Sequence, residues 1–257
     1  MRPRATPSLI VREAEFGGPR PLICVPLVAG DATTLLEQAA FAHALAPDVI
    51  EWRADSFEDL SRDSVARAAR AVRGVLPREA LIFTLRASNE GGARPLAQAQ
   101  RGELIQTAID SGQVDLVDLE LANGPDFVLP MIRLARERSV RVILSFHDFQ
   151  LTPDNSALLA AISEMVRQGA DIAKIACMPR DPGDVLRLLD VTLTARRMFP
   201  AVPLCTMAIG SLGVLTRVAG FLFGSDLSFA VGQTASAPGQ IPIADLRAAI
   251  EVLGRYA

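Results

Sequence analysis

Lysine is nearly absent from this chain of 257 residues. Of its 26 Lys and Arg residues only Lys174 is lysine, which leaves 25 arginines. A codon bias toward arginine would explain the rarity, but not why the single lysine stands in the apolar stretch GADIAKIACMP, residues 169–179. Burial disfavours a charged amine, and a neutral amine can attack a carbonyl to form a Schiff base, which an arginine cannot do. A nucleophile is therefore our first hypothesis for Lys174, and a structural buried ion pair is the alternative.

Cysteine is also scarce, and its distribution excludes a disulfide framework. The three cysteines, Cys24, Cys177 and Cys205, are an odd number, and each lies in an apolar segment typical of a strand. This pattern indicates buried free thiols in a reducing compartment rather than disulfides or a metal cluster.

Long apolar runs and basic runs are missing as well. No stretch reaches the roughly 18 apolar residues of a membrane span, and the opening MRPRATPSL is not followed by the apolar region of a secretory signal. A formal net charge of −3 and a pI near 5.5 argue against nucleic acid as the main partner. We therefore expect a soluble cytoplasmic protein that acts on a small molecule and binds neither nucleic acid nor membranes.

Eight short apolar runs alternate with longer segments of helical spacing, which predicts strands alternating with helices. The runs cover residues 21–29, 48–55, 80–87, 116–121, 141–149, 171–179, 203–210 and 227–233. With no linker-like segment, this pattern favours one (β/α)8 barrel domain over residues 1–257. Residues 1–20 would form an N-terminal extension, and its short strand and turn would close the bottom of the barrel. A doubly wound open sheet is disfavoured because no GxGxxG or P-loop follows the first run.

Polar residues stand near the carboxyl end of nearly every predicted strand. They are Glu51, Arg53 and Asp55, then Arg86 and Glu90, then Asp118 and Glu120, then Ser145 and His147, and finally Lys174. Each alone could form a salt bridge at the edge of the core, but in a barrel these ends meet at one mouth. We therefore expect a common cavity faced by Glu51, Arg53, Arg86, Glu90, His147 and Lys174. The other histidine, His43, is expected on a helix surface, so His147 is the candidate acid/base.

Two other kinds of site have to be weighed. The carboxylates and His147 could bind a metal ion, but Arg53, Arg86 and Lys174 lie among them and would repel a cation, so no metal is expected. The sequence GSLG, residues 210–213, follows the seventh strand, where barrels commonly bind phosphate, although four small residues are a weak signal.

Several blocks of the sequence together resemble the type I 3-dehydroquinate dehydratases over essentially the whole chain. They are EWRAD (51–55), FTLR with the following NEGG (83–92), SFHDF (145–149), GADIAKIACMP (169–179) and the long block from Leu215 to Arg247. The resemblance implies a cofactor-independent barrel lyase that removes water from 3-dehydroquinate to give 3-dehydroshikimate, in the shikimate or quinate pathway. It also implies a homodimer by analogy.

Roles follow position by position from the resemblance. Lys174 would be the Schiff-base lysine, His147 the general acid/base, and Glu90 the carboxylate paired with that histidine. Arg217 would hold the substrate carboxylate. The other substrate-binding residues would be Glu51, Arg53 and Arg86, with Ser236 and Gln240 from a closing loop. One departure is Ile209, where some relatives have a second methionine.

The residue types suit this chemistry. A Schiff base on Lys174 acidifies the neighbouring C–H, and His147 can remove that proton and later protonate the leaving hydroxyl. We expect Glu90 to support the charged imidazole and the nearby guanidinium groups to keep Lys174 neutral. A class I aldolase acting on a sugar phosphate, or a non-catalytic ligand-binding barrel, are the alternatives.

Overall fold

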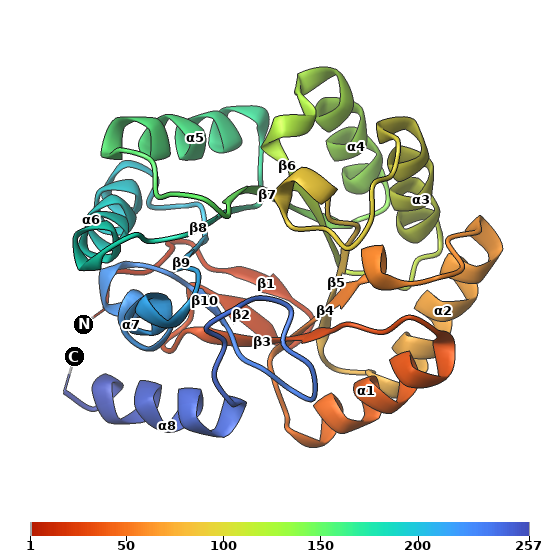
Figure 1. The fold of residues 1–257 in the computed structure, drawn as a ribbon, viewed down its shortest axis with the longest axis horizontal. Coiled ribbons are helices and arrows are strands. Elements are labelled where there is room, and N and C mark those ends of the chain that lie inside the picture. The colour runs from red at the N-terminus through yellow and green to blue at the C-terminus, as the bar shows by residue number, and fades with distance from the viewer. Residues whose placement is uncertain (1, 257) are drawn as a thin grey trace.

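The computed structural model describes residues 2–256, which form a (β/α)8 barrel (Figure 1). The strands are β1 (Leu9–Val11), β2 (Ala14–Phe16), β3 (Leu22–Leu27), β4 (Val49–Arg53), β5 (Ala80–Thr84), β6 (Leu116–Glu120), β7 (Arg141–Asp148), β8 (Ile172–Cys177), β9 (Leu204–Ala208) and β10 (Leu227–Phe229). The α-helices are α1 (Ala32–Ala44), α2 (Arg62–Val75), α3 (Gln98–Asp110), α4 (Pro125–Glu137), α5 (Asn155–Gln168), α6 (Pro182–Met198), α7 (Val214–Ala219) and α8 (Ile243–Gly254).

Eight strands pair in parallel in the order β10-β3-β4-β5-β6-β7-β8-β9. The two end strands are joined where the Asp226 N–H, just before β10, donates to the Leu204 carbonyl of β9 at 2.6 Å. The predicted barrel is thereby confirmed, with all eight strands in the predicted places. The predicted runs extend past the observed carboxyl ends by one to four residues, because the chain leaves the sheet there to surround the barrel mouth.

Side-chain alternation along the strands separates two apolar clusters. In β8, Ile172 and Ala176 belong to the cluster inside the barrel, whereas Ala173 and Ile175 pack outward with the surrounding helices. Lys174 shares the parity of the inward residues and therefore faces the barrel interior. Asp31, Asp154 and Asp181 cap the first turns of α1, α5 and α6, which fixes where these helices begin after their loops.

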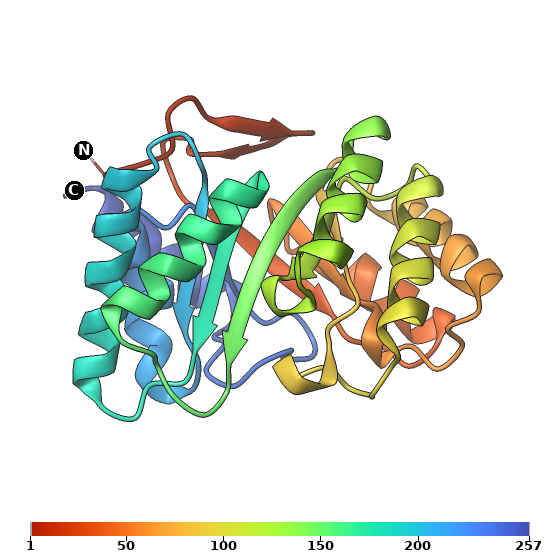
Figure 2. The ribbon, with the colours of Figure 1, turned by 90° about the horizontal axis from the view of Figure 1, so that it is seen from above.

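The N-terminal extension covers the end of the barrel opposite the strands' carboxyl ends (Figure 2). It is more regular than the predicted strand and turn, because β1 and β2 pair as an antiparallel hairpin. Phe16 of this hairpin is fully buried and joins the inner cluster of the barrel, so an apolar plug fills that end. Arg2 ties the chain start to the barrel through Asp226, which also binds Arg196.

Two further predictions, on the cysteines and on His43, can be compared with the structure. The three cysteines are buried free thiols, and His43 lies on α1 with a half-exposed side chain, both as predicted. Helix α7 is short, since it ends at Ala219 and a 3-10 turn follows. No helix among residues 2–256 is long and apolar enough to cross a membrane.

The plug gives a stability prediction. We expect Phe16→Ala to lower the free energy of unfolding by about 3–5 kcal/mol, because it opens a cavity in the inner cluster. Ile10→Ala, on the same hairpin but 66% exposed, should change it by less than about 0.5 kcal/mol. Urea denaturation of both variants measures the two values. Equal free energies of unfolding would contradict a stabilising role of the buried Phe16 ring.

Candidate active site

One cavity at the carboxyl ends of the strands gathers every residue predicted to form the site. Its volume is about 450 Å³ when the part open to solvent is included. It is lined by Glu51, Arg53, Arg86, Glu90, His147, Lys174, Arg217, Ser236 and Gln240, together with Phe149, Ala176, Met207, Ile209, Phe229 and Ala237. The convergence predicted from the strand ends therefore holds in the structure.

Lys174 is buried in this cavity as a paired ammonium. Its Nζ lies 2.8 Å from Asp118 Oδ2 and 3.4 Å from Glu51 Oε1, and 4.8 Å from the centre of the Phe229 ring. Burial by itself lowers the pKa of Lys174, but the negative charges of Asp118 and Glu51 outweigh burial, so the pKa is raised. The charge of Arg86 does lower the pKa of Lys174, in the predicted direction. The prediction of a neutral amine was nevertheless wrong, because the two carboxylates act more strongly.

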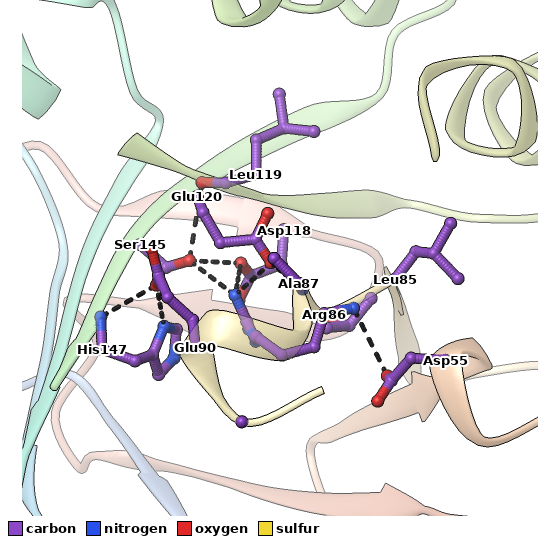
Figure 3. A network of polar contacts seen from close by, with 12 residues as sticks. Asp55, Leu85, Arg86, Ala87, Glu90, Asp118, Leu119, Glu120, Ser145 and His147 are labelled. Carbon is purple, nitrogen blue, oxygen red and sulfur yellow. Dashed lines mark hydrogen bonds and ion pairs between the residues drawn. The ribbon is translucent and has the colours of Figure 1, made fainter. Parts of the chain in front are cut away.

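Arg86 is the centre of a buried network that fixes these carboxylates (Figure 3). Its guanidinium donates to Asp118 Oδ1 at 2.9 Å and Oδ2 at 2.8 Å, and to Glu120 Oε1 and Ser145 Oγ at 2.9 Å each. Burial would raise the pKa of Asp118, yet Arg86 and Lys174 hold it well below its usual range. Arg86 thus lines the cavity while much of its guanidinium already binds protein.

His147 and Glu90 form a second buried pair in the cavity (Figure 3). The His147 Nδ1 lies 2.9 Å from Glu90 Oε2, which also accepts the His147 backbone N–H at 3.0 Å. Burial, followed by the positive charges of Arg86 and Lys174, puts the pKa of His147 well below its usual value. Burial also raises the pKa of Glu90 to about 7.

The predicted pairing of Glu90 with His147 is therefore present, but its predicted effect was wrong. Glu90 does not keep the imidazole charged, because burial and two nearby cations act more strongly in the opposite direction. Since a carboxylate only accepts hydrogen bonds, Nδ1 carries the proton while Glu90 is ionised, and Nε2 keeps a lone pair able to accept a proton.

Arg217 on α7 is a buried cation without a carboxylate partner among residues 2–256. Its contacts are NH1 to Met207 Sδ at 3.4 Å and NH2 to the Pro238 carbonyl at 3.5 Å, while its Nε has no hydrogen-bond partner. Burial lowers the pKa of Arg217 to about 10. An unbalanced guanidinium at the wall of a cavity is suited to bind an anion such as a carboxylate in two-point contact.

The segment between β10 and α8 lies over the cavity mouth and supplies Ser236 and Gln240 (Figure 1). The Gln240 side chain accepts from the Ser236 N–H at 2.9 Å and donates to Ser236 Oγ at 3.1 Å. Gly239 has a φ of +80°, and a Cβ there would lie 2.0 Å from the Gly210 carbonyl oxygen, so only glycine allows this close approach. The segment is thus seated on the turn after β9.

Comparisons with known proteins agree with this geometry. The family model of type I 3-dehydroquinase matches residues 23–257. The 3-dehydroquinate dehydratase of Geobacillus thermodenitrificans is 42% identical over 254 residues, with 97% of each chain covered. The enzyme of that name from Geobacillus kaustophilus is 44% identical over 251 residues, again with 97% of each chain covered.

The chain belongs to the type I 3-dehydroquinase family. Solved structures agree. The 3-dehydroquinate dehydratase crystal structure from Geobacillus kaustophilus superposes with a TM-score of 0.97 at 42% identity, covering 100% of both chains. The type I enzyme of Clostridium difficile, solved with covalently modified comenic acid, gives 0.93 at 32% identity and covers 97% of this chain and 98% of its own. Family membership places the protein among the hydro-lyases.

Within this type I 3-dehydroquinase, Asp118 was not predicted as a site residue, although it contacts Lys174 directly. The available signal was its period-two spacing with Glu120 on a predicted strand, which we interpreted only as a possible metal ligand set. Among residues 2–256 no group of three or more His, Cys, Asp or Glu side chains is placed to hold a metal ion. Met207 and Phe229 were also missed, since an apolar residue on a strand gives no sign that it borders a cavity.

The GSLG turn of this family member contacts the segment between β10 and α8, which is called the closing segment below. The Gly210 N–H donates to the Pro238 carbonyl at 3.0 Å, and the Gly213 N–H donates to the Gly210 carbonyl at 3.0 Å. Two of the amides that a phosphate would need are therefore already bonded, which removes the sequence feature that favoured a sugar-phosphate aldolase.

The electrostatics of His147 give a prediction. We expect its imidazole to be neutral at pH 6, where an ordinary histidine with a pKa near 6.5 is mostly charged, because burial and the neighbouring cations oppose protonation. The variant His43→Gln leaves His147 as the single imidazole, so its ¹⁵N chemical shifts report this ring alone. A titration midpoint at or above pH 6.5 would show that the Glu90 interaction dominates after all.

Proposed function

We propose that this protein converts 3-dehydroquinate to 3-dehydroshikimate by eliminating water through a Schiff base on Lys174. The observation that carries the proposal is the joint placement of an amine, an imidazole–carboxylate pair and an unbalanced guanidinium around one cavity. Each group suits one part of the substrate: the amine can attack the ketone, the imidazole can remove the acidic proton beside it, and the guanidinium can bind the carboxylate. The chemistry needs no cofactor.

Substrate binding starts from the carboxylate. Arg217 is the one arginine of the cavity wall that is not paired with a carboxylate among the described residues, so it is the group with most to gain from an incoming anion. Glu51, Arg53, Ser236 and Gln240 are left to contact the hydroxyl groups. Arg53 is positioned for this by Asp55, which accepts from its Nε at 2.9 Å and its NH2 at 2.8 Å.

The first chemical step has to remove a proton from Lys174, because a charged amine is not a nucleophile. The register pairs Lys174 with Ser145, and His147 lies two residues further along β7 on the same face. Neutral His147 can accept the proton, so that one N–H bond breaks and another forms. The neutral amine then adds to the ketone, and one proton of its nitrogen moves to the oxygen to give a carbinolamine. His147 returns its proton to the carbinolamine hydroxyl, which leaves as water, and the nitrogen becomes part of an iminium ion.

The resulting iminium ion drives the elimination. Its positive nitrogen withdraws electrons from the adjacent carbon, from which His147, neutral again, removes a proton. The enamine expels the β-hydroxyl group, which takes that proton from His147 and departs as water. A further water molecule hydrolyses the imine and releases the product and the Lys174 amine. Glu90 holds the imidazole through Nδ1 during these transfers.

Three expectations from the sequence stay predictions beside this proposal. They are a homodimer, a cytoplasmic location, and a single domain over residues 1–257. Use in the shikimate or the quinate pathway follows from the reaction and is common to both.

The proposed function has a direct test. Incubation with 3-dehydroquinate should increase the ultraviolet absorbance, because elimination creates a conjugated double bond. Lys174→Arg keeps the charge but removes the nucleophile, so we expect turnover to fall by about a thousandfold or more with the fold intact.

The matched control is Arg167→Lys, which makes the opposite exchange at a side chain that is 71% exposed. It should leave turnover unchanged. Near-normal activity in Lys174→Arg would refute the Schiff base. No absorbance change with the wild-type protein, together with aldol cleavage of a sugar phosphate, would refute the function.

A further inference from the structure

Asp118 is more firmly held than any other group that contacts Lys174. Its side chain is fully buried, and besides the Lys174 amine its oxygens accept two hydrogen bonds from Arg86 and one from Ser145 at 2.5 Å. These donors come from β7 and from the residues after β5, so the carboxylate is braced from two sides and cannot turn to follow a moving amine. Glu51 is the weaker partner, at 3.4 Å from Nζ, and it also accepts from Thr84.

We propose that Asp118 is the positioning residue of Lys174, and that its carboxylate, held by Arg86 and Ser145, anchors the amine and keeps it unreactive until substrate binds. This inference rests on the proposed function, since it assigns a way of controlling the nucleophile of that reaction. The amine has to leave Asp118 when it loses its proton, because a neutral amine gains far less from a carboxylate than an ammonium does.

The charges around Lys174 support this assignment. The titratable and charged groups that act on it are Asp118, Glu51, Arg86, His147, Cys24 and Cys205. Burial lowers the pKa of Lys174, and so does the positive charge of Arg86. Asp118 is the largest opposing influence, and the net result is a raised pKa. Without the Asp118 charge, Lys174 would face the Arg86 guanidinium with only Glu51 to offset it.

Two consequences follow, one before and one after substrate binds. Before substrate binds, the anchored ammonium does not react with stray electrophiles such as small aldehydes or anhydrides. When substrate binds, the same anchor has fixed the position on the cavity wall from which Nζ begins its attack, which matters because a nucleophile displaced by about 1 Å can lose about a hundredfold in rate.

Trace acetylation tests the anchor without any substrate. Acetic anhydride reacts only with the neutral amine, and Lys174 is the single lysine, so one peptide reports its reactivity against an added free amino acid. We expect Asp118→Asn to increase acetylation of Lys174 at pH 8 by about tenfold or more, because an opposite charge at this distance shifts a pKa by one unit or more.

Glu120→Gln is the matched control. Glu120 is equally buried, stands two residues from Asp118 on β6 and binds the same Arg86, but does not contact Lys174. Its increase in acetylation should stay below about threefold. Equal increases in the two variants, or none in Asp118→Asn, would overturn the proposal. Wild-type acetylation that follows a midpoint clearly below the ordinary lysine value of about 10.4 would overturn it even if Asp118→Asn does not fold.

Turnover gives the second readout. With 3-dehydroquinate, Asp118→Asn should lose about a hundredfold in kcat with a smaller change in KM, although its amine reacts faster with the anhydride. A rise or no change in kcat would show that Asp118 does not position the amine. The acetylation arm needs no turnover, so a failure of the proposed function shows in the wild-type assay alone, whereas a failure of this inference shows in the variants.

Discussion

The ammonium group of Lys174 is buried inside an apolar barrel, and the arrangement of the charged residues around it follows from this burial. A charge at this depth is tolerated only when it is paired and hydrogen-bonded. Asp118 and Glu51 supply the opposite charge, and Asp118 in turn has to be held against repulsion from Glu120. Arg86 solves this second problem by binding both carboxylates, and Arg101 binds Glu120 from the outside. Asp118, Glu51, Arg86 and Glu120 are therefore connected to the Lys174 ammonium, directly or through one another.

The charges are distributed unevenly around the cavity, so that one side has paired charges and the other has a cation that is unpaired among the described residues. On the side of β4 to β8, cations and carboxylates pair closely. On the side of β9 and α7, Arg217 has only a sulfur atom and a carbonyl as partners. Under the proposed function, an anionic substrate would be drawn to one end of the cavity, and its neutral remainder would extend toward Lys174 and His147. The closing segment from β10 to α8 covers this arrangement through its contact with the turn at Gly210.

Much of this could be predicted from the sequence, because periodicity is a local signal. The alternation of apolar runs and helical segments located all eight strands, and the position of Lys174 in an apolar run indicated a buried amine. The resemblance assigned nine residues that line one cavity. The start of the chain was harder, since three-residue strands such as β1 and β2 are too short for a periodic pattern to be recognised.

The charge state of Lys174 and His147 could not be predicted, because the outcome depends on distances of a few ångströms. The sequence lists arginines and carboxylates near each other but does not say which lies closer to Nζ. Asp118 is at 2.8 Å, and this contact is set by the register of β6, β7 and β8 and by the bracing of its carboxylate. The contact between Glu90 and His147 could not be predicted from the sequence either. It depends on the 3-10 turn of residues 88–90, which places the Glu90 side chain next to β7.

The proposed reaction forms a covalent bond between the substrate and the Lys174 amine. Borohydride reduction during turnover of 3-dehydroquinate, followed by peptide mass mapping, detects this bond, because the chain has no other lysine and only the terminal amine could compete. We expect a stable adduct on the peptide that contains Lys174, formed only when substrate is present. Continued turnover with no adduct on that peptide would refute a Schiff base on Lys174.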